Sequence, residues 1–328
     1  MRTIGFVISH KDGEQRRGII PEDIAKNVKN TGNIVIENGY GMTLGISDEE
    51  YKAVGCKVAS REDTLCCDII ADVKLGDADY LEDIKGSKIL FGWAHAVQNV
   101  KFTDEVLKKN HTVVAWEEIY EDGRYIFYRN REVAGEAAVL HAFRYSGKMP
   151  YDSNVAILGN GKTAKGALRV LHGLGANVDV YDRKLEKLFV KKMYDYDVLI
   201  NCVMWDTSRK DRIIYKEDLK NMKPGTLIID VSCDPYLEIE TSHPTTISNP
   251  VYEVDGVIHY AVDNTPAMFP KTVSNVLSEG VSKYIDILIS CDFDDYSENL
   301  KAATVINAGH ILDERILEFR TSRNLFCK

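Results

Sequence analysis

The apolar residues of this chain fall into short runs that alternate with amphipathic helical patterns. Continuous apolar runs of roughly four to eight residues predict buried strands, whereas apolar positions spaced three and four apart predict helices. In the first part of the chain we predict strands at 4–9, 32–39, 67–74, 86–95 and 111–119 and helices at 21–30 and 47–55. Strands that alternate with helices in this way are typical of an α/β fold with a mostly parallel sheet.

A second alternating unit begins at Asn154. A long helical pattern at 131–147, stopped by Gly147 and Pro150, leads into it. In this unit we predict strands at 154–159, 177–182, 197–203, 223–232 and 257–263 and a helix at 162–175. The tail from Lys271 to Lys328 is predicted to be helical. The pattern as a whole predicts two Rossmann-like domains with mostly parallel sheets.

Length and charge narrow the possible partners. A chain of 328 residues is long enough for about two domains, and its net charge of −9 argues against nucleic acid or an anionic membrane surface as a partner. The N-terminal apolar run is too short for a signal peptide, and no later run is long enough to span a membrane. Seven cysteines without paired spacing form neither a disulfide framework nor a zinc pattern. We expect a cytoplasmic protein that acts on small molecules and has no metal.

The stretch "VAILGNGKTAKG", residues 155–166, contains two overlapping phosphate-binding patterns. A triphosphate loop would need a glycine at position 156, which is an alanine inside the apolar run. The dinucleotide pattern is satisfied by Gly159, Gly161 and Ala164, which follow a predicted strand and open a predicted helix. We therefore predict a dinucleotide site, although a tight turn without any ligand would also explain the glycines.

The end of the next predicted strand bears on the choice of cofactor. Asp182 is placed to accept a hydrogen bond from a ribose 2′-hydroxyl group, which slightly favours NADH. Arg183 and Lys184 follow immediately and could instead bind the 2′-phosphate of NADPH. The expected cofactor is therefore NAD(P)H, with both forms left open.

Polar residues end several apolar runs abruptly, and ligands of α/β folds gather at the carboxyl ends of strands. Lys74 ends "IIADVK", His95 ends "ILFGWAH", and Arg16 lies in the loop after the first strand. These three are predicted to share one edge, while Asp234 closes "LIIDVSCD" on the cofactor side. Two cations, an imidazole and a carboxylate suit a 2-oxo acid substrate.

The chemistry of these groups suggests a role for each. Arg16 offers a forked guanidinium to a substrate carboxylate, and Lys74 and His95 can polarise or protonate a carbonyl or imine that accepts hydride. Each residue also has a structural interpretation, because loop cations are commonly solvated and a histidine at a strand end is often only hydrogen-bonded.

Several stretches together resemble the alanine dehydrogenase superfamily. They are "RRGIIPEDI", the strands that end at Lys74 and His95, "EVAGEAAVL", "IIDVSCDPYLEIETSHPTT" and "NPVYEVDGVIHYAVDNTPAMFPKT". Within this superfamily the chain looks most like carboxyethylornithine synthase, because the segment between Asp182 and "DVLINCV" is short and "DNTPAMFPKTVS" is similar.

The resemblance implies a reductive condensation of pyruvate with the side-chain amine of ornithine or lysine. It implies that Arg16 and Lys74 bind the oxo acid, that His95 is the acid/base, and that Asp234 and Asn264 lie beside the nicotinamide and substrate. It further implies a substrate domain of residues 1–131 plus 272–328 and a dinucleotide-binding domain of residues 132–271. The active site is expected in a cleft between the domains, and the chain is expected to form a homo-oligomer.

Other functions remain open at this point. An alanine dehydrogenase would use ammonia as the amine, and a saccharopine-type dehydrogenase would bind a second dicarboxylate. A regulator that binds NAD(P) without turnover belongs to a different class. It is disfavoured because Arg16, Lys74, His95 and Asp234 are all present.

Overall fold

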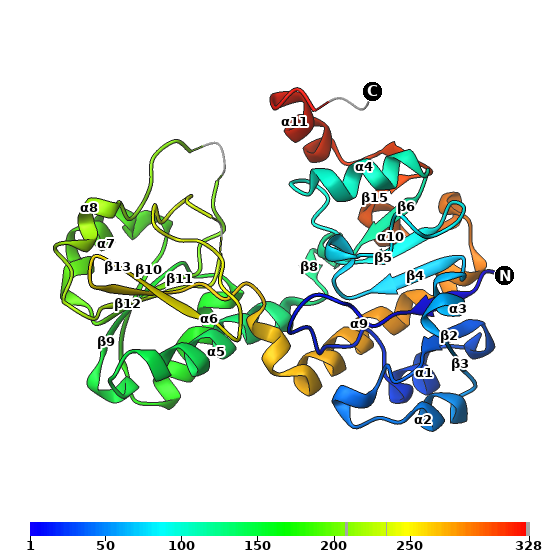
Figure 1. Ribbon diagram of the computed structural model, residues 1–328, viewed down its shortest axis with the longest axis horizontal. Coiled ribbons are helices and arrows are strands. Elements are labelled where there is room, and N and C mark those ends of the chain that lie inside the picture. Colours follow the sequence, from blue (N-terminus) through cyan, green and yellow to red (C-terminus); the bar gives the residue numbers. More distant parts are fainter. Residues whose placement is uncertain (207–208, 234, 326–328) are drawn as a thin grey trace. The chain divides into compact units, whose positions relative to one another are not determined.

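The computed structural model describes residues 1–206, 209–233 and 235–325. The chain forms two compact units, of which unit 1 comprises Met1–Phe127 and Pro270–Lys328 and unit 2 comprises Tyr128–Phe269 (Figure 1). Each unit contains one large, mostly parallel sheet with helices around it, so the predicted α/β fold class is confirmed. Asp234, which is predicted to lie on the cofactor side, falls outside the described residues.

Unit 1 is built on an eight-stranded sheet with the order β16-β15-β6-β5-β4-β1-β2-β3. The part from β3 to β6 has the doubly wound order 3-2-1-4-5-6, in which all neighbours are parallel. Its strands are β1 Ile4–Phe6, β2 Ile34–Glu37, β3 Lys57–Ala59, β4 Ile69–Asp72, β5 Ile89–Gly92, β6 Thr112–Ala115, β15 Thr304–Asn307 and β16 His310–Ile311. A small separate hairpin pairs β7 Tyr120–Glu121 with β8 Arg124–Tyr125.

The helices of unit 1 are α1 Pro21–Asn27, α2 Asp48–Ala53, α3 Arg61–Leu65, α4 Val100–Lys108, α9 Pro270–Ser290, α10 Glu298–Ala303 and α11 Glu314–Ser322. Helix α4 packs on the sheet through Phe102 and Val106, which join a buried cluster with residues of β4, β5 and β6. Helix α9 has the length of a membrane span but contains four charged residues, and none of the helices in the described ranges is apolar enough to cross a bilayer.

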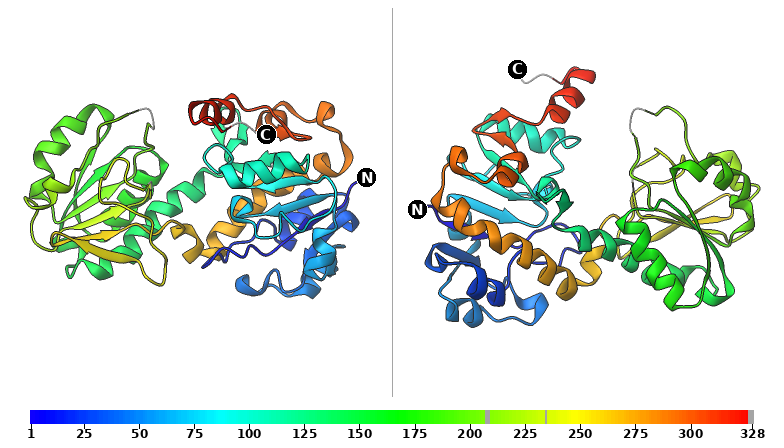
Figure 2. Two further views of the ribbon diagram at one scale, coloured as in Figure 1. Left: turned by 45° about the horizontal axis from the view of Figure 1, so that its top comes forward. Right: turned by 180° about the vertical axis from the view of Figure 1, so that it is seen from behind.

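The prediction of a wholly helical tail is wrong over residues 304–311. Strand β15 pairs antiparallel with β6, with Ile306 opposite Val113, and β16 folds back on β15. In both views of Figure 2 the orange and red tail lies beside the cyan segment of the same unit. The apolar run that forms β15 is only a few residues long, too short for its period to separate strand from helix. Through this pairing the C-terminal segment joins the sheet that the N-terminal part of the chain forms.

Unit 2 contains a six-stranded sheet with the order β10-β9-β11-β12-β14-β13, antiparallel only between β13 and β14. The strands are β9 Asn154–Leu158, β10 Asn177–Tyr181, β11 Val198–Asn201, β12 Leu227–Asp230, β13 Val251–Val254 and β14 Val257–Tyr260. The helices are α5 Tyr128–Ala142, α6 Lys162–Gly173, α7 Glu186–Lys192 and α8 Lys216–Leu219. The order of the strands reverses at β9, so the turn after β9 lies at the topological switch point where such sheets bind ligands.

Helices α5 and α6 cross at two glycines that allow their backbones to touch. A Cβ on Gly135 would lie 2.0 Å from the Thr163 carbonyl oxygen, and a Cβ on Gly166 would lie 1.9 Å from the Glu132 carbonyl oxygen. Real side chains do not tolerate such distances, so the crossing requires glycine at both positions. This contact fixes α6, and therefore the turn that precedes it, against α5.

We predict that Gly166→Ala destabilises unit 2. The added methyl group meets a backbone carbonyl that cannot rotate away, and overpacking of this kind costs about 1–3 kcal/mol. Thermal unfolding should show a lower midpoint. Gly173→Ala is the matched control, because it lies in the same helix with no atom within 4 Å of the added Cβ. If both variants unfold at the same temperature, the glycine crossing does not limit stability.

Candidate functional site

The residues predicted to act on the substrate follow three adjacent parallel strands of unit 1. Strand β1 lies between β2 and β4, and β4 pairs with β5. The loop after β1 carries Arg16, the loop after β4 carries Lys74, and the loop after β5 carries His95. The structure therefore places all three at the carboxyl edge of one sheet, beside its switch point. Their roles remain predictions.

Arg16 is buried and its guanidinium fork is engaged by a neighbour in the same loop. Its Nε and Nη2 donate to the two carboxylate oxygens of Glu14 at 2.9 and 2.5 Å, and its backbone N–H donates to Glu14 at 2.8 Å. The guanidinium also lies over the Trp93 ring, 5.0 Å from its centroid. A substrate carboxylate bound to Arg16 would have to share the guanidinium with Glu14.

Lys74 is only 9% exposed, so its ammonium group has lost most of its water. Desolvation lowers the pKa of Lys74 to about 8, and the positive charges of Arg16 and Lys11 contribute to the same shift. The backbone N–H of Lys74 donates to the carboxylate of Asp72 at 2.9 Å, which fixes the turn after β4. At neutral pH Lys74 is mostly protonated, yet it can lose its proton more easily than an exposed lysine.

The loops after β4 and β5 are tied to each other. The Gly76 N–H donates to the Trp93 carbonyl at 2.8 Å, and the Asn99 side chain donates to the Gly76 carbonyl at 2.7 Å. Glycine is required at the contact, because a Cβ on Gly92 would lie 1.9 Å from the Asp72 carbonyl oxygen and one on Gly76 would lie 2.4 Å from that of Ala94. The two loops therefore move as one piece.

His95 has a left-handed backbone, with φ of 48°, which is strained for a residue with a side chain. Glu117 stabilises this conformation by accepting the backbone N–H groups of His95 at 2.5 Å and Ala94 at 3.2 Å. Burial raises the pKa of the Glu117 carboxyl, and these hydrogen bonds oppose that shift. These two hydrogen bonds fix the backbone from which the His95 side chain projects.

Desolvation by surrounding protein atoms lowers the pKa of His95, and the positive charge of Lys74 lowers it further. His95 is nonetheless exposed in unit 1, so solvent weakens the lowering of its pKa by desolvation. Both causes act in the same direction, and the imidazole is therefore neutral at pH 7 and able to accept a proton.

The sequence reasoning missed Glu14, Trp93 and Glu117. Glu117 lies just after β6, which ends at Ala115. The predicted strand ran to residue 119, so Glu117 was not recognised as a polar residue that follows a strand, as Lys74 and His95 were. Glu14 and Trp93 gave no such signal, because their contacts with Arg16 depend on how the first loop folds back.

In unit 2 the glycine motif forms a tight turn between β9 and α6. Gly159 has φ of 111°, and a Cβ there would lie 2.8 Å from the Cys202 carbonyl oxygen. Gly161 is the N-cap of α6, no side chain among the described residues caps that helix end, and a Cβ on Gly161 would meet nothing within 4 Å. Ala164 is buried beneath the turn. An open turn that presents uncapped N–H groups fits a dinucleotide pyrophosphate.

Asp182 follows β10 and is engaged in its own turn. Its Oδ1 accepts the backbone N–H groups of Lys184 at 2.9 Å and Leu185 at 3.2 Å. The Arg183 side chain is 84% exposed, and its Nη2 lies 4.0 Å from the Asp206 carboxylate. The carboxylate is thus held at the strand end, whereas the guanidinium is mostly in solvent.

The two remaining predicted site residues have different outcomes. Asn264 is buried in unit 2 and precedes the 3₁₀ turn Thr265–Met268, where its carbonyl accepts the Ala267 N–H at 3.0 Å. Asp234 lies outside the described residues.

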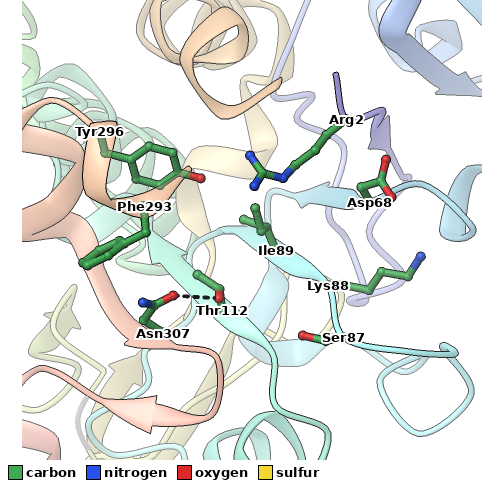
Figure 3. Close-up of a pocket in the computed structure, with 9 residues that line it drawn as sticks. All are labelled: Arg2, Asp68, Ser87, Lys88, Ile89, Thr112, Phe293, Tyr296 and Asn307. Carbon is green, nitrogen blue, oxygen red and sulfur yellow. Dashed lines mark hydrogen bonds between the residues drawn. The ribbon is translucent and has the colours of Figure 1, made fainter. Parts of the chain in front are cut away.

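A pocket of about 260 Å³ lies at the other end of the unit 1 strands (Figure 3). Ile89 and Thr112, the first residues of β5 and β6, form part of its wall. Arg2 and Tyr296 point toward each other across it. Because it lies at the amino ends of the strands, this pocket is separate from Lys74 and His95.

Two protein-family models match the sequence. The model described as "Alanine dehydrogenase/PNT, N-terminal domain" matches residues 8–127, and that described as "Alanine dehydrogenase/PNT, C-terminal domain" matches residues 186–314. The second match begins at residue 186, after the glycine turn that contains Gly159 and Gly161. The sequence pattern and the structure therefore identify that turn without the family model.

Individual relatives agree with these models. An N(5)-(carboxyethyl)ornithine synthase from Clostridium botulinum is 32% identical over 300 residues, which is 86% of this chain and 93% of the relative. Alanine dehydrogenase 1 from Staphylococcus aureus is 26% identical over 88% of this chain and 87% of its own length. The solved structure of an L-alanine dehydrogenase has a TM-score of 0.84 at 21% identity, covering 98% of this chain and 99% of that one, and shows the shared fold.

We predict that Lys74→Met stabilises the protein at pH 7. The pKa of Lys74 falls from 10.5 to about 8 on folding, so between these pH values the unfolded chain binds more protons and stability rises with pH. Below pH 8 the full penalty applies, and its removal should raise the free energy of unfolding by about 1–3 kcal/mol.

Urea unfolding at pH 7 and pH 10 measures this effect, and the gain should shrink at pH 10. Lys57→Met, at an exposed lysine of β3, is the control and should change stability little at either pH. A Lys74→Met protein that is less stable than the wild type at pH 7 would contradict the proposed penalty.

Proposed function

Because this chain belongs to the alanine dehydrogenase/PNT family, we propose that it condenses pyruvate with the side-chain amine of ornithine or lysine and reduces the product. The broader activity follows from the family: the chain is an oxidoreductase that uses a nicotinamide cofactor and acts on CH–NH groups. The product proposed here is an N-(1-carboxyethyl) amino acid.

One observation carries the proposal. The chain is 32–33% identical to carboxyethylornithine synthases over 86% of its length, whereas its identity to the alanine dehydrogenases is 26% over a similar span. The short segment after β10 supports it, since only α7 and short 3₁₀ turns separate Asp182 from β11. Alanine dehydrogenase activity, with ammonia as the amine, is the alternative.

The proposed reaction is a condensation followed by a reduction. The amine nitrogen attacks the pyruvate carbonyl carbon, water leaves, and a C=N bond forms. A bound reduced nicotinamide would supply the hydride for the imine carbon, and one proton would complete the secondary amine. The protein must therefore hold a carboxylate, move protons at the amine and carbonyl oxygen, and bind the cofactor.

The residues of unit 1 suit the first two tasks. We assign the pyruvate carboxylate to Arg16, with Glu14 limiting the guanidinium to part of its fork. Lys74, protonated at pH 7, would donate to the carbonyl oxygen. His95, neutral at pH 7, would take the proton that an ammonium substrate must lose before attack and return it to the departing water.

Unit 2 suits the third task. Gly159, Gly161 and the start of α6 would hold the pyrophosphate, and Asp182 would bind the ribose hydroxyl groups, which favours NADH. Arg183 is exposed enough to turn toward a 2′-phosphate and would support NADPH. We further assign Asp234 and Asn264 to the nicotinamide end.

The domain roles extend this assignment. We propose residues 1–131 with 272–328 as the substrate domain and residues 132–271 as the dinucleotide-binding domain. Each range carries part of the proposed active site, since Arg16, Lys74 and His95 fall in the first range and the glycine turn falls in the second.

We predict that the protein oxidises reduced cofactor when pyruvate and a diamino acid are both present. The assay follows absorbance at 340 nm, a standard wavelength for reduced nicotinamide, with NADH and NADPH in parallel and ornithine, lysine, arginine or ammonia as the amine, on the order of one turnover per second or faster. Turnover with ammonia and none with a diamino acid would instead make the protein an alanine dehydrogenase. No oxidation of reduced cofactor with any amine would favour a regulator that binds the cofactor without turnover.

We predict that His95→Ala lowers kcat by about 10²- to 10⁴-fold, because the proton acceptor is lost, while cofactor affinity is unchanged. Steady-state kinetics and a fluorescence titration with reduced cofactor measure the two quantities. His310→Ala, at an exposed histidine on β16, is the control. If His95→Ala weakens cofactor binding as much as turnover, the residue does not have the proposed role.

A further inference from the structure

The turn after β10 and the segment after β11 approach each other in unit 2. Strand β9 lies between β10 and β11, and all three are parallel, so their carboxyl ends share one edge of the sheet. The turn after β10 carries Asp182 and Arg183, and the segment after β11 carries Asp206. In a dinucleotide fold the strand that follows the glycine turn ends at the adenosine ribose. The charges of these three residues therefore surround the position of a 2′-hydroxyl or 2′-phosphate group.

The backbone of Asp206 is anchored by its neighbours. Trp205, which precedes it, is only 8% exposed and packs in a buried cluster with Tyr181 of β10 and Phe189 of α7. The carbonyl oxygen of Asp206 accepts the Arg209 N–H at 2.9 Å, and the Arg209 guanidinium lies over the Trp205 ring, 4.4 Å from its centroid. The Asp206 carboxylate therefore projects from a defined place in the fold.

Arg209 ties this segment to the turn after β10. Its Nη1 and Nη2 donate to the two carboxylate oxygens of Glu186 at 2.9 and 2.8 Å. Its Nε and Nη2 also donate to Asp211 at 2.9 and 2.7 Å. Glu186 is the first residue of α7 and follows the turn that carries Arg183. Paired hydrogen bonds of this kind are strong, so Arg209 acts as a link between the two segments and its charge is already compensated.

Arg183 and Asp206 face each other across this link. The Arg183 side chain is 84% exposed and that of Asp206 is 48% exposed, and the Arg183 Nη2 lies 4.0 Å from the Asp206 carboxylate. An exposed pair contributes little to stability, but it changes the potential that a third charge meets. A 2′-phosphate would meet an arginine whose charge Asp206 compensates, with the Asp182 carboxylate beside it. A ribose with free hydroxyl groups brings no charge and can donate hydrogen bonds to a carboxylate.

We propose that Asp206 is a specificity-determining residue that makes the protein select NADH over NADPH. Its carboxylate compensates Arg183 and repels a 2′-phosphate, whereas Asp182 supplies the acceptor for the ribose. This inference rests on the proposed dinucleotide site and names the form of the cofactor that the site takes. Arg183 and Lys184, both exposed, would be available to a 2′-phosphate if the Asp206 charge were removed.

Fluorescence titrations of the full chain with NADH and with NADPH test the proposal, because they measure each Kd without a second substrate. The variants are Asp206→Asn, Arg183→Ala and the two combined. The matched control is Asp255→Asn, which makes the same change at an exposed aspartate between β13 and β14, far from β10 in the strand order. Asp255 has φ of 49°, a conformation that asparagine also adopts readily.

We expect wild-type protein to bind NADH more tightly than NADPH. Asp206→Asn should lower the ratio of the NADPH Kd to the NADH Kd about tenfold, mainly through tighter binding of NADPH. The gain should shrink in about 1 M salt, where exposed charges are screened. In the combined variant most of the gain should be lost, because Arg183 is the group that the substitution releases. Asp255→Asn should match the wild type.

The proposal is overturned if wild-type protein binds both forms equally, or if Asp206→Asn changes the ratio no more than Asp255→Asn does. A gain that persists in full without Arg183 would contradict the compensation of that residue by Asp206. Because the Asp206 side chain is half-exposed, its substitution removes no buried contact. Failure of the proposed dinucleotide site gives a different result, since wild-type protein would then bind neither NADH nor NADPH.

Discussion

The site of unit 1 depends on the close approach of the carboxyl ends of β4 and β5. Two adjacent parallel strands can come this near only where a side chain is absent, and Gly92 provides that gap against the Asp72 carbonyl. Gly76 provides a second gap against the loop that carries His95. Because the backbones can approach at both glycines, the hydrogen bonds that join the two loops hold Lys74 near His95, and the positive charge of Lys74 lowers the pKa of His95.

This arrangement concentrates positive charge where the protein has little water. Lys74 is buried near Arg16 and Lys11, and such a cluster opposes folding unless anions compensate it. Glu14 compensates Arg16 directly and Asp77 compensates Lys11. The buried lysine therefore contributes no stability at neutral pH. Its retention is better explained by a ligand that completes the charge balance, since groups of this kind occur at functional sites where stability is sacrificed.

Much of the fold could be predicted from the sequence because buried parallel strands are continuous apolar runs. The run at 111–119 shows the limit of this signal, since β6 ends at Ala115 and a 3₁₀ turn follows, so the carboxyl edge and Glu117 were misplaced. Strand β15 was not predicted, because it forms only through pairing with β6, which lies far away in the chain. The partnership of Arg16 with Glu14 was likewise invisible, because two residues in one loop meet only through the path of its backbone.

The distribution of charge along the edge of unit 1 gives the proposed reaction a direction. The positive charges of Arg16 and Lys11 act on both Lys74 and His95, and Glu14 and Asp77 pair with Arg16 and Lys11. The oxo-acid end of the proposed condensation product carries a carboxylate, which these cations can bind, whereas its amino-acid end carries an ammonium as well as a carboxylate. An oxo acid that binds these cations by charge would place its carbonyl near Lys74 and His95, and the same cations would repel the α-ammonium end of the amine from that position.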